Sequence, residues 1–220
     1  MEWQAAWLTL RLAFWTTVWL TLLGIPLAWW IATRRYRWMF LIEAVVALPI
    51  VLPPTVLGFY VLMALGPRSP VGGLWMDATG APIPFTFTGI LIGSILFNLP
   101  FAVRPFVAGF SSVDRRLVEA SWSLGVSGSR TFLRIVLPLA WPGILTGVVL
   151  AFAHTIGEFG VVLMVGGNIP GVTQTLSILI YDQVQALDYA AANRTALAML
   201  LFSFTLLCGI FAGQRRMMPL

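Results

Sequence analysis

The sequence has little charge and few of the side chains that enzymes use for catalysis. Only 10% of its 220 residues are charged, all 13 basic residues are arginine, and there is one cysteine and one histidine. It contains no G-x-x-x-x-G-K-[ST] loop for nucleotide phosphates, no H-E-x-x-H pair and no G-x-S-x-G elbow. We therefore expect no ATP hydrolysis, catalytic residue, resident cofactor or metal cluster on this chain. The lone Cys208 excludes a disulfide within it.

Apolar residues are what the chain has in abundance. They make up 59% of it, and the mean hydropathy is +0.91, which is too apolar for a soluble domain. The net charge of +5 does not indicate nucleic-acid binding, because the arginines are scattered between apolar segments. That distribution fits the positive-inside bias of membrane proteins. The sequence therefore predicts an all-α, polytopic protein embedded in lipid.

Five apolar segments are long enough to cross a bilayer, which takes about 20 residues each. They are 8–32, 39–65, 85–110, 141–165 and 194–213. The first has no basic leading region and no small-residue cleavage site, so we expect a retained helix and not a removed signal peptide. Between the spans, the connector 66–84 is too rich in glycine and proline to cross, and 166–193 is too polar to span throughout.

Prolines interrupt the second predicted span. Pro49, Pro53 and Pro54 break the helical ladder there, and carbonyls freed inside a membrane need partners. We therefore expect a buried or cavity-lining position and take Pro53 and Pro54 as candidates for the transport pathway. An ordinary proline-kinked packing helix explains them as well.

The fourth predicted span carries both a stripe of small residues and two ionisable ones. Gly143, Gly147 and Ala151 recur every four residues, which lets another helix approach closely. His154 and Glu158 continue this face and can hydrogen-bond each other. Ionisable side chains in a membrane helix are costly unless paired or hydrated. Three interpretations stay open: a structural clasp or interface contact, a pathway contact, and proton or metal chemistry.

The polar residues Thr173, Gln174 and Thr175 lie in the segment 166–193. They are candidates for an outer gate, or else solvated turn residues. A short helix is predicted to follow them, lying at the outer interface or dipping partway into the membrane. Its expected apolar face comprises Leu176, Leu179, Ile180, Val184 and Leu187.

The longest polar interruption is the stretch 115–138, RRLVEASWSLGVSGSRTFLRIVLP. Ser111 and Asp114 are predicted to cap a helix of about three turns. Gly125 should end it in a left-handed conformation, before a second helix over 130–137 that stops at Pro138. One face of the first helix is expected to carry Leu117, Ala120, Ser121 and Leu124. A short exposed amphipathic helix suits insertion into a groove on a cytoplasmic partner.

Glu119-Ala120-Ser121, then Gly125, then Ile135-x-Leu137-Pro138, resembles the EAA signature of the permease subunits of bacterial ABC importers. Ser121 stands where the pattern has its second alanine. The resemblance implies one permease domain over 1–220 with the type-I import fold and a cytoplasmic coupling stretch at 114–138. It also implies that this helix docks into an ATPase subunit, which binds ATP and magnesium. The docking residues carried over are Arg115, Arg116, Glu119, Ala120, Ser121 and Gly125.

Two further segments resemble the molybdate group of these permeases. They are LPIVLPPTVLGFY at 48–60 and GEFGVVLMVGGNIPGVTQTLSILIYD at 157–182. The resemblance implies a homodimer that receives molybdate from an extracytoplasmic oxyanion-binding protein. Tungstate and sulfate are the alternative substrates, since all three are tetrahedral dianions. A proton-coupled secondary transporter using His154 and Glu158 is the alternative from another class, and an intramembrane enzyme is a more distant one.

The arginines predict the orientation in the membrane. Five spans place all but three of them on one side, leaving Arg11, Arg68 and Arg194 on the other. The arginine-rich side should be the cytoplasm. We therefore expect a bacterial inner-membrane protein with its N-terminus outside, its C-terminus inside and the stretch 114–138 facing the compartment that contains ATP.

Overall fold

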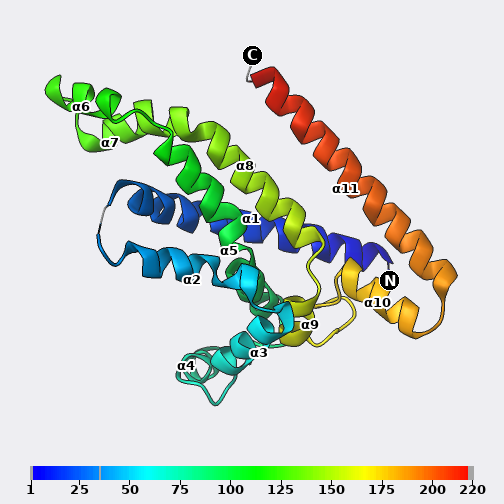
Figure 1. The fold of residues 1–220 in the computed structure, drawn as a ribbon. Coiled ribbons are helices and arrows are strands. Elements are labelled where there is room, and N and C mark those ends of the chain that lie inside the picture. Colours follow the sequence, from blue (N-terminus) through cyan, green and yellow to red (C-terminus); the bar gives the residue numbers. More distant parts are fainter. Residues whose placement is uncertain (1, 35, 218–220) are drawn as a thin grey trace. The chain divides into compact units, whose positions relative to one another are not determined.

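The computed structural model describes residues 2–34 and 36–217, which contain helices and no strands. The chain forms two compact units. Unit 1 comprises Met1–Trp15, Pro53–Ser94 and Ala153–Leu220, and unit 2 comprises Thr16–Leu52 and Ile95–Phe152. The boundaries between them fall at Leu52 and inside three long helices (Figure 1): α1 (Glu2–Thr33), α5 (Phe87–Ser111) and α8 (Leu137–Ile156).

Unit 2 contains the short elements α2 (Met39–Val51), α6 (Arg115–Ser123), α7 (Gly128–Thr131) and the π-helical turn η1 (Phe132–Val136). Its core surrounds Phe106 of α5, which is fully buried. A Cβ atom would lie 3.1 Å from this ring at Gly24 of α1 and 2.5 Å from it at Gly147 of α8. Glycine at these two positions therefore lets both helices pack directly onto Phe106.

The predicted stripe of small residues does mediate close packing between α5 and α8. A Cβ atom on Gly143 would lie 2.5 Å from the Cα atom of Gly109. Ala151 is fully buried on the same helix. Because backbone meets backbone, no larger side chain fits at Gly143 without moving a helix. Such close approach is how membrane helices gain van der Waals contact.

Unit 1 contains α3 (Pro54–Leu65), α4 (Pro70–Thr79), α9 (Gly160–Gly166), α10 (Leu176–Gln185) and α11 (Tyr189–Met217). The short helices α3 and α9 pack on each other through glycines. A Cβ atom would lie 2.7 Å from Met164 Cβ at Gly58 and 2.8 Å from Pro54 Cβ at Gly160. A small apolar core is formed by Leu12, Ile90, Val162 and Ile178.

The spans agree with the prediction of about five. Four helical segments in the described residues are long and apolar enough to cross a membrane, namely Glu2–Thr33, Phe87–Ser111, Gly128–Ile156 and Tyr189–Gly209. The pair α2 and α3 is a fifth if it is counted as one broken span. The break lies where the prolines predicted it. Leu52 and Pro53, between the two helices, each have ψ 135°, which is outside the helical range.

The predicted fourth span, 141–165, is wrong in both boundaries. The helical segment begins at Gly128 and ends at Ile156, and α9 is a separate helix. Tight turns end α8, because the amide of Gly157 donates to the His154 carbonyl and that of Glu158 to the Thr155 carbonyl, both at 3.2 Å. Glycine at 157 favours such an ending. Hydropathy missed the break because apolar residues continue on both sides of it.

Candidate functional site: the coupling hairpin and the outer loop

Helix α6 begins at an aspartate cap. The Asp114 carboxylate accepts a hydrogen bond of 2.9 Å from the Arg116 amide, which otherwise has no partner in the first helical turn. The prediction that Ser111 shares this cap is wrong, since Ser111 is the last residue of α5. A carboxylate at this position also opposes the positive end of the helix dipole.

The corner after α6 has the geometry of a Schellman motif, as the glycine predicted. Gly125 has φ +76°, and its amide donates to the Trp122 carbonyl at 2.9 Å. The Val126 amide donates to the Ser121 carbonyl at 3.1 Å. These bonds satisfy carbonyls that the end of a helix would leave free, and they fix the direction of the chain.

The helix after the corner differs from the prediction of 130–137. It begins at Gly128 and runs through η1 into α8, so it does not stop at Pro138. In η1 the Leu137 amide bonds to the Phe132 carbonyl, five residues back. This wider turn lies just before Pro138, whose ring would otherwise clash with the carbonyl four residues earlier. Figure 1 shows α6 and α7 as a hairpin between α5 and α8; we call α6, α7 and the corner between them the coupling hairpin.

The exposed surface of the coupling hairpin carries most of the predicted docking residues. Arg115, Arg116, Glu119 and Ala120 are all exposed on α6. The large apolar side chains Leu117 and Leu124 are 47% and 82% exposed beside them. The surface is therefore mixed, with charged groups around apolar ones, as a protein interface requires.

Ser121 does not belong to this exposed face, which corrects the predicted set. It is 5% exposed, and its hydroxyl lies 2.8 Å from the hydroxyl of Thr131 in α7. A side chain buried against α7 cannot present itself to a partner. Ser121 contributes to the internal structure of the coupling hairpin, whereas the neighbouring residues provide its surface.

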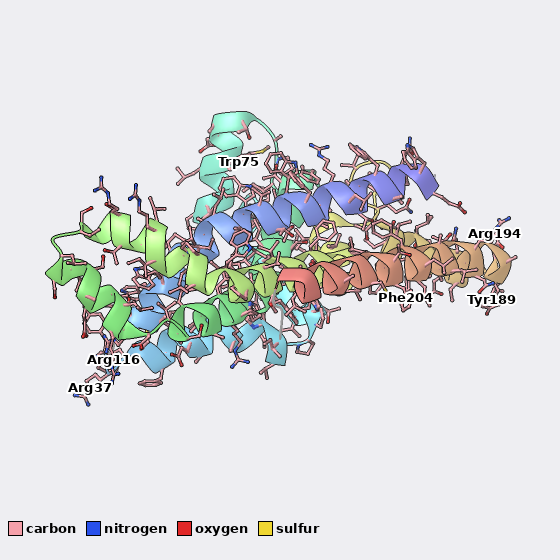
Figure 2. The ribbon with its side chains drawn as sticks, turned by 90° about the horizontal axis from the view of Figure 1, so that it is seen from above. Arg37, Trp75, Arg116, Tyr189, Arg194 and Phe204 are labelled. Carbon is pink, nitrogen blue, oxygen red and sulfur yellow. The ribbon has the colours of Figure 1, made fainter. Side chains whose placement is uncertain are left out.

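Arginines gather at the same end of unit 2 as the coupling hairpin. Figure 2 shows Arg37 and Arg116 there. Arg34, Arg37, Arg115, Arg116, Arg130 and Arg134 are all exposed. Arg35 lies outside the described residues. This concentration of positive charge follows the pattern on which the predicted orientation rests.

The loop over residues 167–175 holds buried polar side chains, and we call it the outer loop after its predicted location. Thr173, Gln174 and Thr175 are 0%, 7% and 2% exposed, so their interpretation as solvated turn residues is wrong. The Thr173 hydroxyl donates to the Gly166 carbonyl at 2.7 Å and accepts from the Ile169 amide at 2.9 Å. The role of these residues in a gate stays a prediction.

A carboxylate on α10 closes this loop. Asp182 accepts hydrogen bonds of 2.9 Å from Asn168 Nδ2, at both of its oxygens, and one of 2.9 Å from Gln174 Nε2. Gln174 Nε2 also donates to Asn168 Oδ1 at 3.0 Å. Charge-assisted bonds of this kind are among the stronger ones in proteins. Asn168, Gln174 and Asp182, which we call the amide–carboxylate cluster, therefore hold the outer loop against α10.

Helix α10 exists as predicted, but its buried face differs. Ile178 and Leu179 are buried, whereas Val184 and Leu187 are 42% and 71% exposed. Leu187 lies beyond the helix with φ +59°. The Leu176 amide donates to Thr9 Oγ1 of α1 at 2.9 Å, which sets the rotation of the helix. This contact across the sequence could not be read from local periodicity.

The remaining candidates lie at breaks in helices. Pro53 precedes α3 and Pro54 is its first residue, and both are exposed. His154 lies in the last turn of α8, but Glu158 follows the end of that helix and is 3% exposed. The prediction that they share one helical face is therefore wrong. The described residues contain no group of three or more His, Cys, Asp or Glu that could hold a metal.

Sequence reasoning missed the partners of these residues. Thr131, Asn168 and Asp182 each complete a hydrogen-bonded group but were not selected. A signal existed for Asp182, because it directly follows the apolar run 178–181, where a carboxylate is costly unless paired. Thr131 carried no such signal, since its partner Ser121 is ten residues away across a turn.

The fold and the coupling hairpin define the class of protein. Residues 21–217 match the family described as binding-protein-dependent transport system inner membrane component. The chain therefore belongs to this family and is a multi-pass permease component of the inner membrane. The same match confirms the resemblance to the permease subunits of bacterial ABC importers.

Among its relatives, the chain is 48% identical over 208 residues to the molybdenum transport system permease protein ModB of Azotobacter vinelandii, covering 94% of this chain and 92% of that one. It is 32% identical to a probable sulfate transport system permease protein cysT of Chlorella vulgaris, covering 91% and 75%. Its fold is similar to a chain of the bacterial alginate ABC transporter solved with an alginate-bound periplasmic protein, with TM-score 0.78, 18% identity and coverage of 97% and 78%. The predicted type-I importer fold is thereby confirmed.

Proposed function

We propose that this chain is the membrane-spanning subunit of an ATP-driven importer that moves molybdate into the cytoplasm. The 48% identity to a molybdenum transport permease over nearly the whole of both chains carries this proposal. The similarity to a sulfate permease is weaker and covers less of that chain. Tungstate and sulfate remain the competing substrates, because both are tetrahedral dianions like molybdate.

The coupling hairpin is the proposed contact with an ATPase subunit. Its exposed Leu117 and Leu124 provide apolar contact, and Arg115, Arg116 and Glu119 surround them with charge. A rigid helix with a mixed surface fits a groove on a partner. ATP and magnesium would then act on the partner chain, which supplies the phosphate-binding loop that this sequence lacks.

The proposed assembly contains two copies of this chain, two ATPase subunits and a binding protein on the outer side. Support for the binding protein comes from the family description and from the alginate transporter, which was solved with a periplasmic protein. The exposed arginines beside the coupling hairpin support a cytoplasmic location for it. The N-terminus would then lie outside and the C-terminus inside.

Alternating access is the proposed mechanism. ATP binding would bring the ATPase subunits together and draw the coupling hairpins with them, so that the spans open outward. Hydrolysis and product release would restore the inward-facing state. An oxyanion in the pathway should meet hydroxyl and amide dipoles and no fixed positive charge that would trap it. Thr173, Gln174 and Thr175 stay candidates for an outer gate, and Pro53 and Pro54 for the pathway wall.

Reconstitution tests this function. The chain, its ATPase and its binding protein in proteoliposomes should accumulate radiolabelled molybdate only when ATP is supplied. Excess unlabelled tungstate and sulfate would rank the competing substrates. Uptake that persists without ATP and collapses with the proton gradient would instead favour a secondary transporter.

A charge-reversing variant tests the docking surface. Glu119→Arg should lower ATPase recruitment, and Asp188→Arg, at an exposed position in unit 1, is the matched control.

A further inference from the structure

The coupling hairpin contains a hydrogen bond between two buried hydroxyl groups. Ser121 Oγ and Thr131 Oγ1 are 2.8 Å apart. Thr131 Oγ1 also donates to the Ser127 carbonyl at 3.1 Å. A hydroxyl has one proton to give, so Ser121 is the donor in the pair. An ordered chain of hydrogen bonds therefore runs from α6 through Thr131 to the start of α7.

Ser121 fixes the corner through its backbone as well as its side chain. Its carbonyl accepts from the Val126 amide at 3.1 Å, which closes the turn around Gly125. Its hydroxyl crosses the corner to Thr131. An alanine at this position, as in the EAA pattern, keeps the first bond and lacks the second. The hydroxyl pair is thus an addition to the motif and not a requirement of it.

The residue after Thr131 connects the coupling hairpin to the long helices. Phe132 is the first residue of η1. Its ring centroid lies 5.4 Å from that of Trp29 on α1 and 6.1 Å from that of Phe110 on α5. Trp29 and Phe110 are themselves 5.4 Å apart. Packed aromatic rings of this kind move together when one of them is displaced.

We propose that Ser121 and Thr131 are positioning residues that make the coupling hairpin move as one rigid body. This inference rests on the proposed docking of α6 to an ATPase. With the hydroxyl pair intact, a displacement of α6 turns α7 and reaches Trp29 and Phe110 through Phe132. Without it, α6 still offers its docking surface, but it rotates about the Gly125 corner. ATP hydrolysis then continues while less substrate is moved for each ATP.

Hydrogen exchange on the full-length chain in lipid nanodiscs tests the structural part without any partner. Ser121→Ala and Thr131→Val each remove one hydroxyl and should raise the exchange rate of the corner amides, Gly125 and Val126, by about fivefold. Thr131→Ser keeps a hydroxyl and should leave exchange unchanged. Unaltered exchange in both Ser121→Ala and Thr131→Val would overturn the proposal.

Transport per ATP hydrolysed tests the functional part in proteoliposomes with the ATPase and the binding protein. Each single variant should lower this ratio by about fivefold while ATPase recruitment stays at the wild-type level. The double variant should be no worse than either single one, because the two residues share one interaction. A wild-type ratio in both variants, or additive losses, would overturn the positioning role. If the wild-type chain recruits no ATPase, the proposed function itself fails, and the exchange experiment still decides whether the hydroxyl pair holds the corner.

Discussion

Two glycines with nearly the same backbone conformation end helices in different surroundings. Gly125 follows α6 with φ +76°, and Gly167 follows α9 with φ +66°. A Cβ atom at Gly125 would meet nothing within 4 Å, whereas one at Gly167 would lie 2.7 Å from Phe85 Cδ1. Position 125 thus has open space around it, and its glycine serves to redirect the chain. The outer loop packs its corner against a neighbouring side chain.

The side chains around the two corners differ in the same way, since those near Gly125 are exposed and those near Gly167 are engaged in contacts within the chain. Near Gly125 the polar residues Arg115, Arg116 and Glu119 point to the exterior. Near Gly167 the amide–carboxylate cluster is occupied with its own hydrogen bonds. A surface that binds another protein has to leave its groups available, whereas a loop that must keep one shape satisfies them internally. The two corners can therefore be distinguished by mutation.

The largest effect is expected at Gly167. Gly167→Ala should lower the free energy of unfolding by about 2–4 kcal/mol, because left-handed strain and a clash with Phe85 act together. Denaturant titration in detergent, followed by tryptophan fluorescence, measures it. Gly80→Ala is the matched control, since Gly80 has φ +74° and open space around it, and strain alone should cost about 1 kcal/mol. Equal losses in the two variants would contradict the importance of packing at Gly167.

The next effect concerns the amide–carboxylate cluster. Asp182→Ala removes the acceptor of the half-buried Asn168 amide and one of the two acceptors of the buried Gln174 amide. It should therefore destabilise the chain by about 2–3 kcal/mol. Asp188→Ala is the control. Its exposed carboxylate caps α11 by accepting from the Ala191 amide at 3.0 Å, and its loss should cost about 1 kcal/mol. The same titration distinguishes the two variants. An Asp182 variant as stable as wild type would contradict the role of the cluster in holding the outer loop against α10.

The smallest effect on stability is expected at Gly125. Gly125→Val should cost about 1–2 kcal/mol through strain alone, and it should weaken ATPase recruitment about tenfold, since 1.4 kcal/mol corresponds to that factor. Gly125→Asn should be nearly neutral, because asparagine tolerates the left-handed conformation. Binding of the purified ATPase to permease in nanodiscs measures the affinities. Unchanged recruitment by the valine variant would show that the direction of α6 is irrelevant to docking.

Local composition sufficed for much of this fold. Runs of apolar residues located the spans, the prolines around Pro53 located a real break, and Gly125 located a left-handed corner. Gly143 and Gly147 marked close packing because small residues in a membrane helix have few other uses. In each case the cause lies within a few residues of the effect.

Most of the misses have non-local causes. The end of α8 at Ile156 is the exception, because it depends on turns within 154–158 that hydropathy alone does not reveal. The rotation of α10 depends on Thr9, which is far away in the sequence. The burial of Ser121 depends on Thr131 across the corner. The cluster around Asp182 joins an amide in the outer loop to a carboxylate in the following helix, 14 residues away. The periodicity of a single segment does not reveal contacts between residues so far apart.

The π-helical turn at Phe132–Val136 sets the angular phase between the coupling hairpin and the span that follows it. An α-helix advances by 3.6 residues per turn, or about 100° for each residue, and a five-residue hydrogen-bonded ring adds one residue to the count. Deleting one residue within this turn would restore α-helical spacing and swing α6 around the axis of α8 by about a quarter of a circle. The residues of the α6 surface would be unchanged, but the surface would face another direction. The π-helical turn therefore determines the direction in which the coupling hairpin presents α6.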